Sequence, residues 1–242
     1  MREHLETAPV WDAVRGGRGC PFCALRDMIE KQSVQRFLGG AVMQPDMRLR
    51  TNAVGFCAAH HRLLMAEKDY HGYALMMQTR LTEVRAQVEA SIRRLPAQGG
   101  GRLFGHRGEA LASVQGAVSR CLVCESIAEH HQKYLDTFLQ LYGQDPAFRE
   151  AFSACPGICL SDLPEVAEAA RAKLSGPVLK EFLQTLSDTA LRALSVAQED
   201  LDALCSSFHV GSEHKDNPRC RGALERAVNL LRGSVFSEAE RP

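Results

Sequence analysis

The chain has 242 residues, and its 29 Lys and Arg residues balance 29 Asp and Glu residues, so the formal net charge is zero. A neutral chain lacks the long-range attraction to phosphate on which most nucleic-acid-binding proteins depend, so nucleic acid is not an expected partner. Hydrophobic residues make up 45% and charged residues 24%, which is the balance of a folded globular protein. No apolar run suits a signal peptide or a membrane span, so we expect a cytoplasmic protein without membrane contact.

The predicted elements are helices throughout. Thr7 caps a short helix that ends at Gly16-Gly17, and a second helix from Cys20 to Leu38 carries apolar residues mainly at helical spacing. Cys57 and His60 open another helix. Further helices are predicted at 69–95, 122–142, 146–153, 162–174, 178–206 and from Pro218 to Leu231. Strand-like alternation is almost absent, so the predicted fold class is all-α.

One cysteine–histidine pattern occurs twice along the chain. Its first copy is Cys20-Pro21-Phe22-Cys23 followed, after 31 residues, by Gly55-Phe56-Cys57-Ala58-Ala59-His60. The second copy is Cys121-Leu122-Val123-Cys124 followed, after 32 residues, by Gly157-Ile158-Cys159-Leu160-Ser161-Asp162. Two close ligand pairs separated by a helical stretch are typical of a tetrahedral zinc site. In the reducing cytosol, such cysteines indicate metal ligands or reactive thiols before disulfides.

The repeat extends beyond the cysteines. An offset of 101 residues matches Phe37-Leu38 with Phe138-Leu139 and Pro45 with Pro146, and an offset of 102 then matches Gly55 with Gly157. We therefore predict an internal duplication. The first zinc-stapled helical unit is predicted at residues 1–95, and the second, with a C-terminal helix, at residues 109–242. A Gly-rich linker, residues 96–108, joins them.

Each predicted unit is expected to bind metal with its own copy of the pattern. The first site comprises Cys20, Cys23, Cys57 and His60, with His61 as an alternative ligand; zinc is favoured over an iron–sulfur cluster or inert buried cysteines. In the second site Asp162 replaces the histidine, and the ligands are Cys121, Cys124, Cys159 and Asp162, with Cys155 as an alternative. One zinc ion is expected and a second is possible, because the second site is also compatible with a metal-free relic. His130 and His131, nearly two helical turns after Cys124, are remote candidate ligands and are predicted to be surface residues.

Several stretches, including Thr7-Ala8-Pro9-Val10-Trp11-Asp12-Ala13, Met43-Gln44-Pro45-Asp46-Met47-Arg48 and Tyr134-Leu135-Asp136-Thr137-Phe138, together with the cysteine blocks, resemble an uncharacterised family of bacterial proteins. That family is known only as a domain of unknown function, and the resemblance covers nearly the whole chain. In the family the second block is similar to Gly-Phe/Ile-Cys-Leu-Pro-His, and Ser161-Asp162 departs from it. The resemblance implies an architecture but no activity.

The sequence contains no nucleophile elbow, no phosphate-binding glycine loop and no dinucleotide fingerprint. The leading hypothesis is a non-enzymatic interaction protein that is stabilised by structural zinc and binds an unidentified protein partner. One alternative is a thiol- or metal-responsive sensor whose second zinc site is labile. A less favoured alternative is a zinc-dependent enzyme in which Asp162 leaves a coordination position to water.

Overall fold

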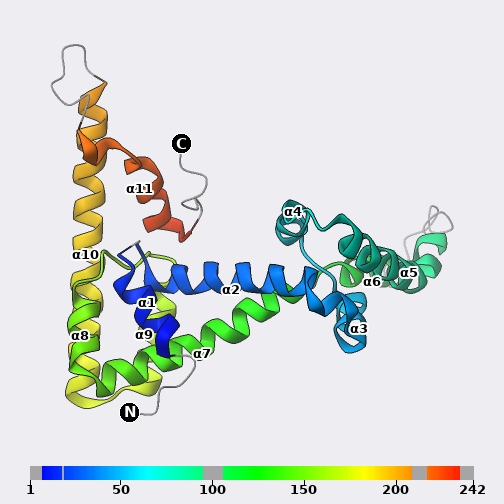
Figure 1. Ribbon diagram of the computed structural model, residues 1–242, viewed down its shortest axis with the longest axis horizontal. Coiled ribbons are helices and arrows are strands. Elements are labelled where there is room, and N and C mark those ends of the chain that lie inside the picture. Colours follow the sequence, from blue (N-terminus) through cyan, green and yellow to red (C-terminus); the bar gives the residue numbers. More distant parts are fainter. Residues whose placement is uncertain (1–6, 18, 95–105, 209–216, 235–242) are drawn as a thin grey trace. The chain divides into compact units, whose positions relative to one another are not determined.

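The computed structural model describes residues 7–17, 19–94, 106–208 and 217–234 (Figure 1). Across these ranges it contains helices and no strand, which confirms the predicted all-α fold. The elements are α1 (Thr7–Arg15), α2 (Pro21–Leu38), η1 (Gly40–Met43), α3 (Pro45–Val54), α4 (Ala58–Ala66), α5 (Tyr70–Arg94), α6 (His106–Ala117), α7 (Leu122–Gln144), α8 (Pro146–Ser153), α9 (Leu163–Lys173), α10 (Gly176–Ser207), η3 (Pro218–Cys220) and α11 (Ala223–Arg232).

Local sequence signals account for many of the helix ends. A proline lies in the first turn of α3, α8, α9 and α10, where its missing N–H costs no helical hydrogen bond. Asp145 caps α8, because its side chain accepts a hydrogen bond of 2.9 Å from the backbone N–H of Ala147. Gly55 and Gly233 end α3 and α11 with φ angles of 77° and 82°, which disfavour any residue with a Cβ.

The chain folds into two compact units. The first unit contains the residues up to Met28 and those from His130 onwards, and the second unit contains Ile29–Glu129. Helices α2 and α7 therefore contribute to both units. The predicted division into residues 1–95 and 109–242 follows the sequence repeat and remains a prediction. Of the predicted linker, residues 96–105 lie outside the described part of the chain, and His106 already begins α6.

The core of the first unit is a cluster of aromatic rings. Phe138 of α7 is fully buried, and its ring centroid lies 4.8 Å from that of Phe22 and 5.0 Å from those of Phe148 and Phe152. Trp11 of α1 packs edge-on against Phe148 at 5.0 Å. Within this unit α11 lies beside the long helix α10 (Figure 1). Burial of this many rings makes the cluster the main apolar contribution to the unit's stability.

The core of the second unit joins α2, α3, α4, α5 and the start of α7. Its buried members include Phe37, Phe56, Leu64 and Val123. The only arginine buried among the described residues, Arg80, donates hydrogen bonds to the backbone carbonyls of Asn52 and Ala117, at the ends of α3 and α6. These bonds satisfy carbonyls that a helix terminus leaves without a partner.

Helices α2 and α7 meet through opposite ends in each unit. In the first unit Phe22, near the start of α2, packs against Phe138 in the C-terminal half of α7. In the second unit Ser33, in the C-terminal half of α2, contacts Ser126 near the start of α7, with 3.1 Å between their hydroxyl oxygens. Within each unit, the start of one helix thus lies beside the far end of the other.

Candidate metal centres

All eight predicted ligands assemble into two groups, and within each group the donor atoms lie within 4.8 Å of one another. We call the groups site A (Cys57, His60, Cys121 and Cys124) and site B (Cys20, Cys23, Cys159 and Asp162). Each site takes its Cys-x-x-Cys pair from one copy of the sequence pattern and its second pair from the other copy. The prediction that each copy forms its own site is therefore wrong.

The length of α2 explains the exchange. Cys20 and Cys23 lie at its start in the first unit, and its 18 residues span about 27 Å at 1.5 Å per residue. The chain that leaves its C-terminal end, including Cys57, belongs to the second unit, where Cys121 immediately precedes α7. Helix α7 in turn carries the chain back to the first unit, where Cys159 follows. Helices α2 and α7 thus separate each Cys-x-x-Cys pair from the second ligand pair of the same sequence copy, which lies in the other unit.

Site A has the dimensions of a tetrahedral zinc centre. Zinc–sulfur bonds of about 2.3 Å and zinc–nitrogen bonds of about 2.0 Å require sulfur–sulfur separations of about 3.8 Å and sulfur–nitrogen separations of about 3.5 Å. The Sγ atoms of Cys57 and Cys124 are 3.9 Å apart. His60 Nδ1 lies 3.1 Å from the Sγ atoms of Cys57 and Cys121 and 3.4 Å from that of Cys124. A small outward shift of the His60 ring from the sulfurs is enough to reach these separations.

Glu30 of α2 orients the His60 ring. Its Oε1 lies 2.9 Å from His60 Nε2, so the proton of the neutral ring belongs on Nε2 and the lone pair of Nδ1 faces the sulfurs. The second ring nitrogen of a metal-bound histidine donates to a carboxylate, a backbone carbonyl or water, and Glu30 is a partner of the first kind. In the metal-free protein Glu30 is the main cause that raises the pKa of His60 to about 9, although burial opposes it. A metal ion that binds at Nδ1 must therefore displace a proton at neutral pH.

The loop before α4 delivers Cys57 to this site. The carbonyl oxygen of Gly55 accepts a 3.0 Å hydrogen bond from the backbone N–H of Leu122, which joins the loop to the start of α7. A Cβ on Gly55 would also lie 2.9 Å from Arg80 Nε. Burial raises the pKa of the Cys57 thiol, but the backbone N–H and the charge of His60 outweigh it, and the pKa falls to about 7. The thiolate that binds metal is therefore readily formed at this position.

Site B has a similar size but a different fourth donor. The Sγ atoms of Cys23 and Cys159 are 3.6 Å apart, and Asp162 Oδ2 lies 3.2 Å from Cys20 Sγ and 3.4 Å from Cys23 Sγ. A zinc–oxygen bond of about 2.0 to 2.2 Å requires sulfur–oxygen separations of about 3.6 Å. Burial, followed by hydrogen bonding to Cys159, raises the pKa of the Cys20 thiol well above its ordinary value. Without a cation, these buried sulfurs cannot all be ionised together.

Arg26 balances the extra negative charge of site B. Its guanidinium donates one hydrogen bond to Asp162 Oδ1 and another, of 3.1 Å, to Glu165 Oε2. A divalent ion with three thiolates and an imidazole carries a net charge of −1, whereas three thiolates and a carboxylate give −2. The positive charge of Arg26 returns site B with its immediate partner to −1. The ion pair also leaves Oδ2 as the oxygen directed toward the sulfurs.

The end of α11 covers site B. The carbonyl oxygen of Leu230 accepts a 2.8 Å hydrogen bond from the backbone N–H of Leu160, which lies next to Cys159. A Cβ built on Gly233 would lie 3.5 Å from Cys23 Sγ and 3.9 Å from Cys159 Sγ, so the backbone passes close to both sulfurs. The backbone N–H of Ser234 helps to lower the pKa of Cys23, although the neighbouring thiols Cys159 and Cys20 are the larger causes. Residues about 70 positions from Cys159 thus form part of this site's surroundings, and the cysteine pattern gave no signal for them.

The two alternative ligands lie outside both groups. His61 Nδ1 is hydrogen-bonded to the hydroxyl group of Tyr73. Cys155 is buried in the aromatic core of the first unit, and its Sγ lies 4.0 Å from the carbonyl oxygen of Gly157. The prediction that His131 is a surface residue is wrong, because only 4% of it is exposed. It occupies an inward-facing position on α7, which the weak sequence signal of two adjacent histidines did not reveal.

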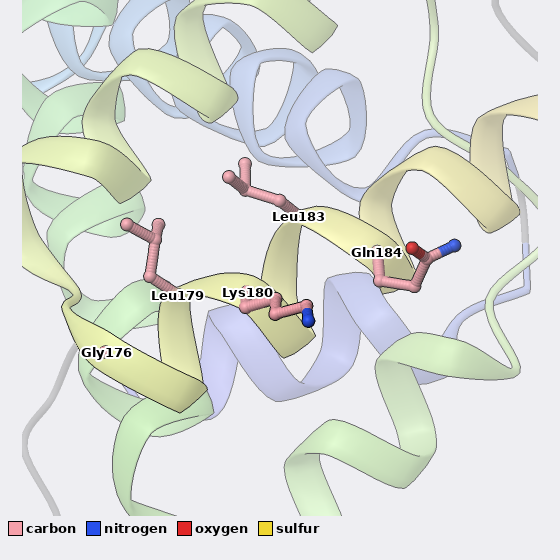
Figure 2. Close-up of a pocket in the computed structure, with 5 residues that line it drawn as sticks. All are labelled: Gly176, Leu179, Lys180, Leu183 and Gln184. Atoms are coloured by element: carbon pink, nitrogen blue, oxygen red, sulfur yellow. The ribbon is translucent and has the colours of Figure 1, made fainter.

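The surface depressions described for the molecule are separate from the metal groups. One, with a volume of about 400 Å³, is lined by five residues of α10: Gly176, Leu179, Lys180, Leu183 and Gln184 (Figure 2). Another is lined by Met43, Pro45, Arg48, Leu49 and Asn52. Neither lining includes a ligand of site A or B, so neither depression provides a substrate cleft at a metal position.

None of the described helices combines the length and apolar character needed to cross a membrane. Comparison with curated proteins and with solved structures gave no match. The family model described as "Family of unknown function (DUF6062)" matches residues 1–238. That span includes all eight candidate ligands of sites A and B. The chain therefore belongs to this family of unknown function.

Proposed function

We propose that the protein is a non-enzymatic, zinc-stabilised interaction protein of the cytosol, in which sites A and B each hold one structural zinc ion. The observation that carries the proposal is site A, where three sulfurs and one imidazole nitrogen converge and Glu30 fixes the ring. Three thiolates and an imidazole favour zinc over harder divalent ions, and they fill all four positions of a closed tetrahedral shell.

Short segments surround the two sites, and a bound zinc ion would stabilise them. Helix α4 has 9 residues, too few to be stable alone, and Cys57 and His60 at its start attach it to α7. Structural zinc in small modules contributes on the order of 10 kcal/mol, which is enough to fix such a segment. The zinc ions would therefore determine how the loops and short helices of both units pack.

Metal analysis of the purified full-length protein tests the proposal. We expect two zinc ions per chain, and we expect removal of zinc by a strong chelator to reduce the midpoint of thermal unfolding. A chain that contains neither zinc nor iron, yet unfolds cooperatively at an unchanged temperature after exposure to chelator, would contradict the proposal. Partial loading after purification is controlled by reconstitution with zinc under reducing conditions.

The interaction role is supported by an exposed apolar surface in the second unit. Met43 and Leu49 are 81% and 68% exposed and line the same depression. Apolar side chains gathered in this way favour contact with a protein partner. A cross-linking pull-down should lose a specific partner with Leu49→Glu and keep it with Leu81→Glu, which alters a side chain of similar exposure (61%) on α5. Equal retention by both variants would contradict this assignment.

A second candidate function, a thiol- or metal-responsive sensor, is supported by the exposure of Cys124 in site A. Its Sγ lies 3.9 Å from that of Cys57. A peroxide would join the two sulfurs in a disulfide, taking two electrons from two thiolates and forming two water molecules with two protons, and zinc would be released. The sequence-based hypothesis assigned lability to the site that contains Asp162, whereas the exposed thiol supports site A. Mild peroxide should therefore release one zinc ion and form a Cys57–Cys124 disulfide, which peptide mass mapping of the oxidised protein detects; full zinc retention without this disulfide would contradict the sensor function.

A further inference from the structure

His131 is a buried imidazole beside site B whose role the two metal groups do not explain. Its exposed fraction is 4%, and its Nε2 has no hydrogen-bond partner among the described residues. Its ring packs edge-on against Phe22, the residue before Cys23, with ring centroids 6.4 Å apart. A buried polar nitrogen without a partner is costly and in native proteins commonly marks a position for an ion or water.

The sequence repeat matches His131 with Glu30, the carboxylate partner of His60 in site A. His131 follows Glu30 by 101 residues, the same offset that relates Cys121 to Cys20. In site A, position 30 provides the carboxylate and position 60 the imidazole, and the two groups are hydrogen-bonded. In site B, the corresponding positions hold His131 and Asp162. The carboxylate and the imidazole therefore occupy opposite positions in the two sites, and each site has one carboxylate and one imidazole at this pair of positions.

His131 is not among the donors of site B that lie within 4.8 Å of one another, but it has a carboxylate nearby, as a metal-binding histidine does. Its Nδ1 lies 3.7 Å from Glu165 Oε1, so one ring nitrogen faces a carboxylate and the other, Nε2, is left as the donor. Glu165 is in turn bound by Arg26, the partner of Asp162. Burial, and next the positive charge of Arg26, lower the pKa of His131 and so favour the neutral ring that binds metal.

We propose that His131 Nε2 and the Asp162 carboxylate are exchangeable fourth donors of site B for a divalent metal ion. The inference rests on the proposed zinc function. The three cysteine sulfurs hold the ion in both states. When the carboxylate is bound, the shell is that of three sulfurs and one oxygen. When the imidazole is bound, Asp162 remains ion-paired with Arg26. The coordination shell then has three sulfurs and one nitrogen, as in site A.

The exchange involves no change in total charge. The ion, three thiolates, Asp162 and Arg26 carry a sum of −1 whether the carboxylate oxygen or the neutral ring is bound. The alternative donor therefore replaces the first without an uncompensated charge in the interior, which would otherwise be costly. Zinc accepts this change of ligand because its filled d shell imposes no geometric preference.

Substitution at position 162 tests the proposal. We expect Asp162→Asn to keep two zinc ions per chain, and the Asp162→Asn/His131→Gln double variant to keep one, that of site A. The matched control is Asp162→Asn/His130→Gln, which alters the neighbouring imidazole and should keep two. Cobalt(II) absorption provides a second measure, because Asp162→Asn should shift the site B spectrum toward that of site A. Loss of one ion in Asp162→Asn alone, or its retention in the double variant that lacks His131, would overturn the proposal.

A measurement on the unaltered protein avoids any effect of substitution on folding. In ¹⁵N-histidine NMR of the full chain during zinc titration, we expect the Nε2 resonance of His131 to move toward the position that metal-bound His60 Nδ1 shows. A His131 resonance that is identical before and after site B fills would overturn the proposal even if every variant misfolds. If neither site takes up zinc, the proposed function itself fails. If site B takes up zinc and the His131 resonance does not move, only the role of His131 fails.

Discussion

Replacement of Glu30 by alanine should weaken zinc binding at site A without removing any ligand. Glu30 Oε1 accepts a charge-assisted hydrogen bond of 2.9 Å from His60 Nε2, and its side chain is 37% exposed. Bonds of this type contribute about 1.5 to 3 kcal/mol, and access of water to the exposed part favours the lower end. About 1.5 kcal/mol corresponds to about a tenfold increase in the zinc dissociation constant. This estimate agrees with the range of about 10- to 100-fold for the loss of a ligand-orienting partner.

The assay is competition for zinc between the protein and a chromophoric chelator, fitted with two binding sites. Site A should weaken about tenfold while site B keeps its affinity. Glu89→Ala provides the matched control, because Glu89 is 39% exposed, lies in the same unit and pairs only with Arg85 and Arg93 of its own helix among the contacts described. Unchanged affinity in Glu30→Ala, or an equal loss in Glu89→Ala, would refute the view that Glu30 orients the imidazole.

Three further predictions concern other parts of the structure. Gly233→Ala should release the zinc of site B because a Cβ strains a backbone with φ of 82° and ψ of −169° beside Cys23 and Cys159. Gly222→Ala, with a φ of 66° and a ψ of 15° in the left-handed helical region, should keep both ions, and metal analysis distinguishes these outcomes. Because the pKa of His60 is raised to about 9, zinc must displace a proton from the ring at lower pH. The zinc affinity of site A should therefore rise with pH, and His60 should add less to this rise above about pH 9. A zinc affinity that does not change between about pH 7 and 9 in chelator competition would contradict this. Phe138→Ala should reduce the free energy of unfolding by about 3 to 5 kcal/mol in urea titration of the zinc-loaded protein, and a loss below about 1 kcal/mol would show that the aromatic cluster tolerates a cavity.

Helix positions, and the residues that converge in sites A and B, could be predicted from sequence because their signals are local. The predicted helices at 146–153 and 178–206 differ little from Pro146–Ser153 and Gly176–Ser207. Prolines and cysteine spacing mark these features within a few residues. The short α3 and the helix that begins at His106 were not predicted, since their apolar periodicity is weak.

The pairing of the ligands could not be predicted, because it depends on long-range structure. Sequence spacing shows that Cys57 and His60 share one helical turn, but it does not show which Cys-x-x-Cys pair they meet. The answer follows from the roughly 27 Å length of α2, which removes Cys20 and Cys23 from that neighbourhood. The interior position of His131 depends in the same way on the packing of α7 against Phe22.

Each candidate metal site combines residues from both copies of the sequence pattern. Metal analysis of two double variants tests it most directly, with Cys57→Ser as the shared substitution. Combined with Cys121→Ser, it alters site A alone, and one zinc ion per chain should remain. Combined with Cys23→Ser, it alters both sites, and no zinc should remain. The reverse result, with no zinc in the first variant and one ion in the second, would show that each copy binds its own metal and would contradict the account.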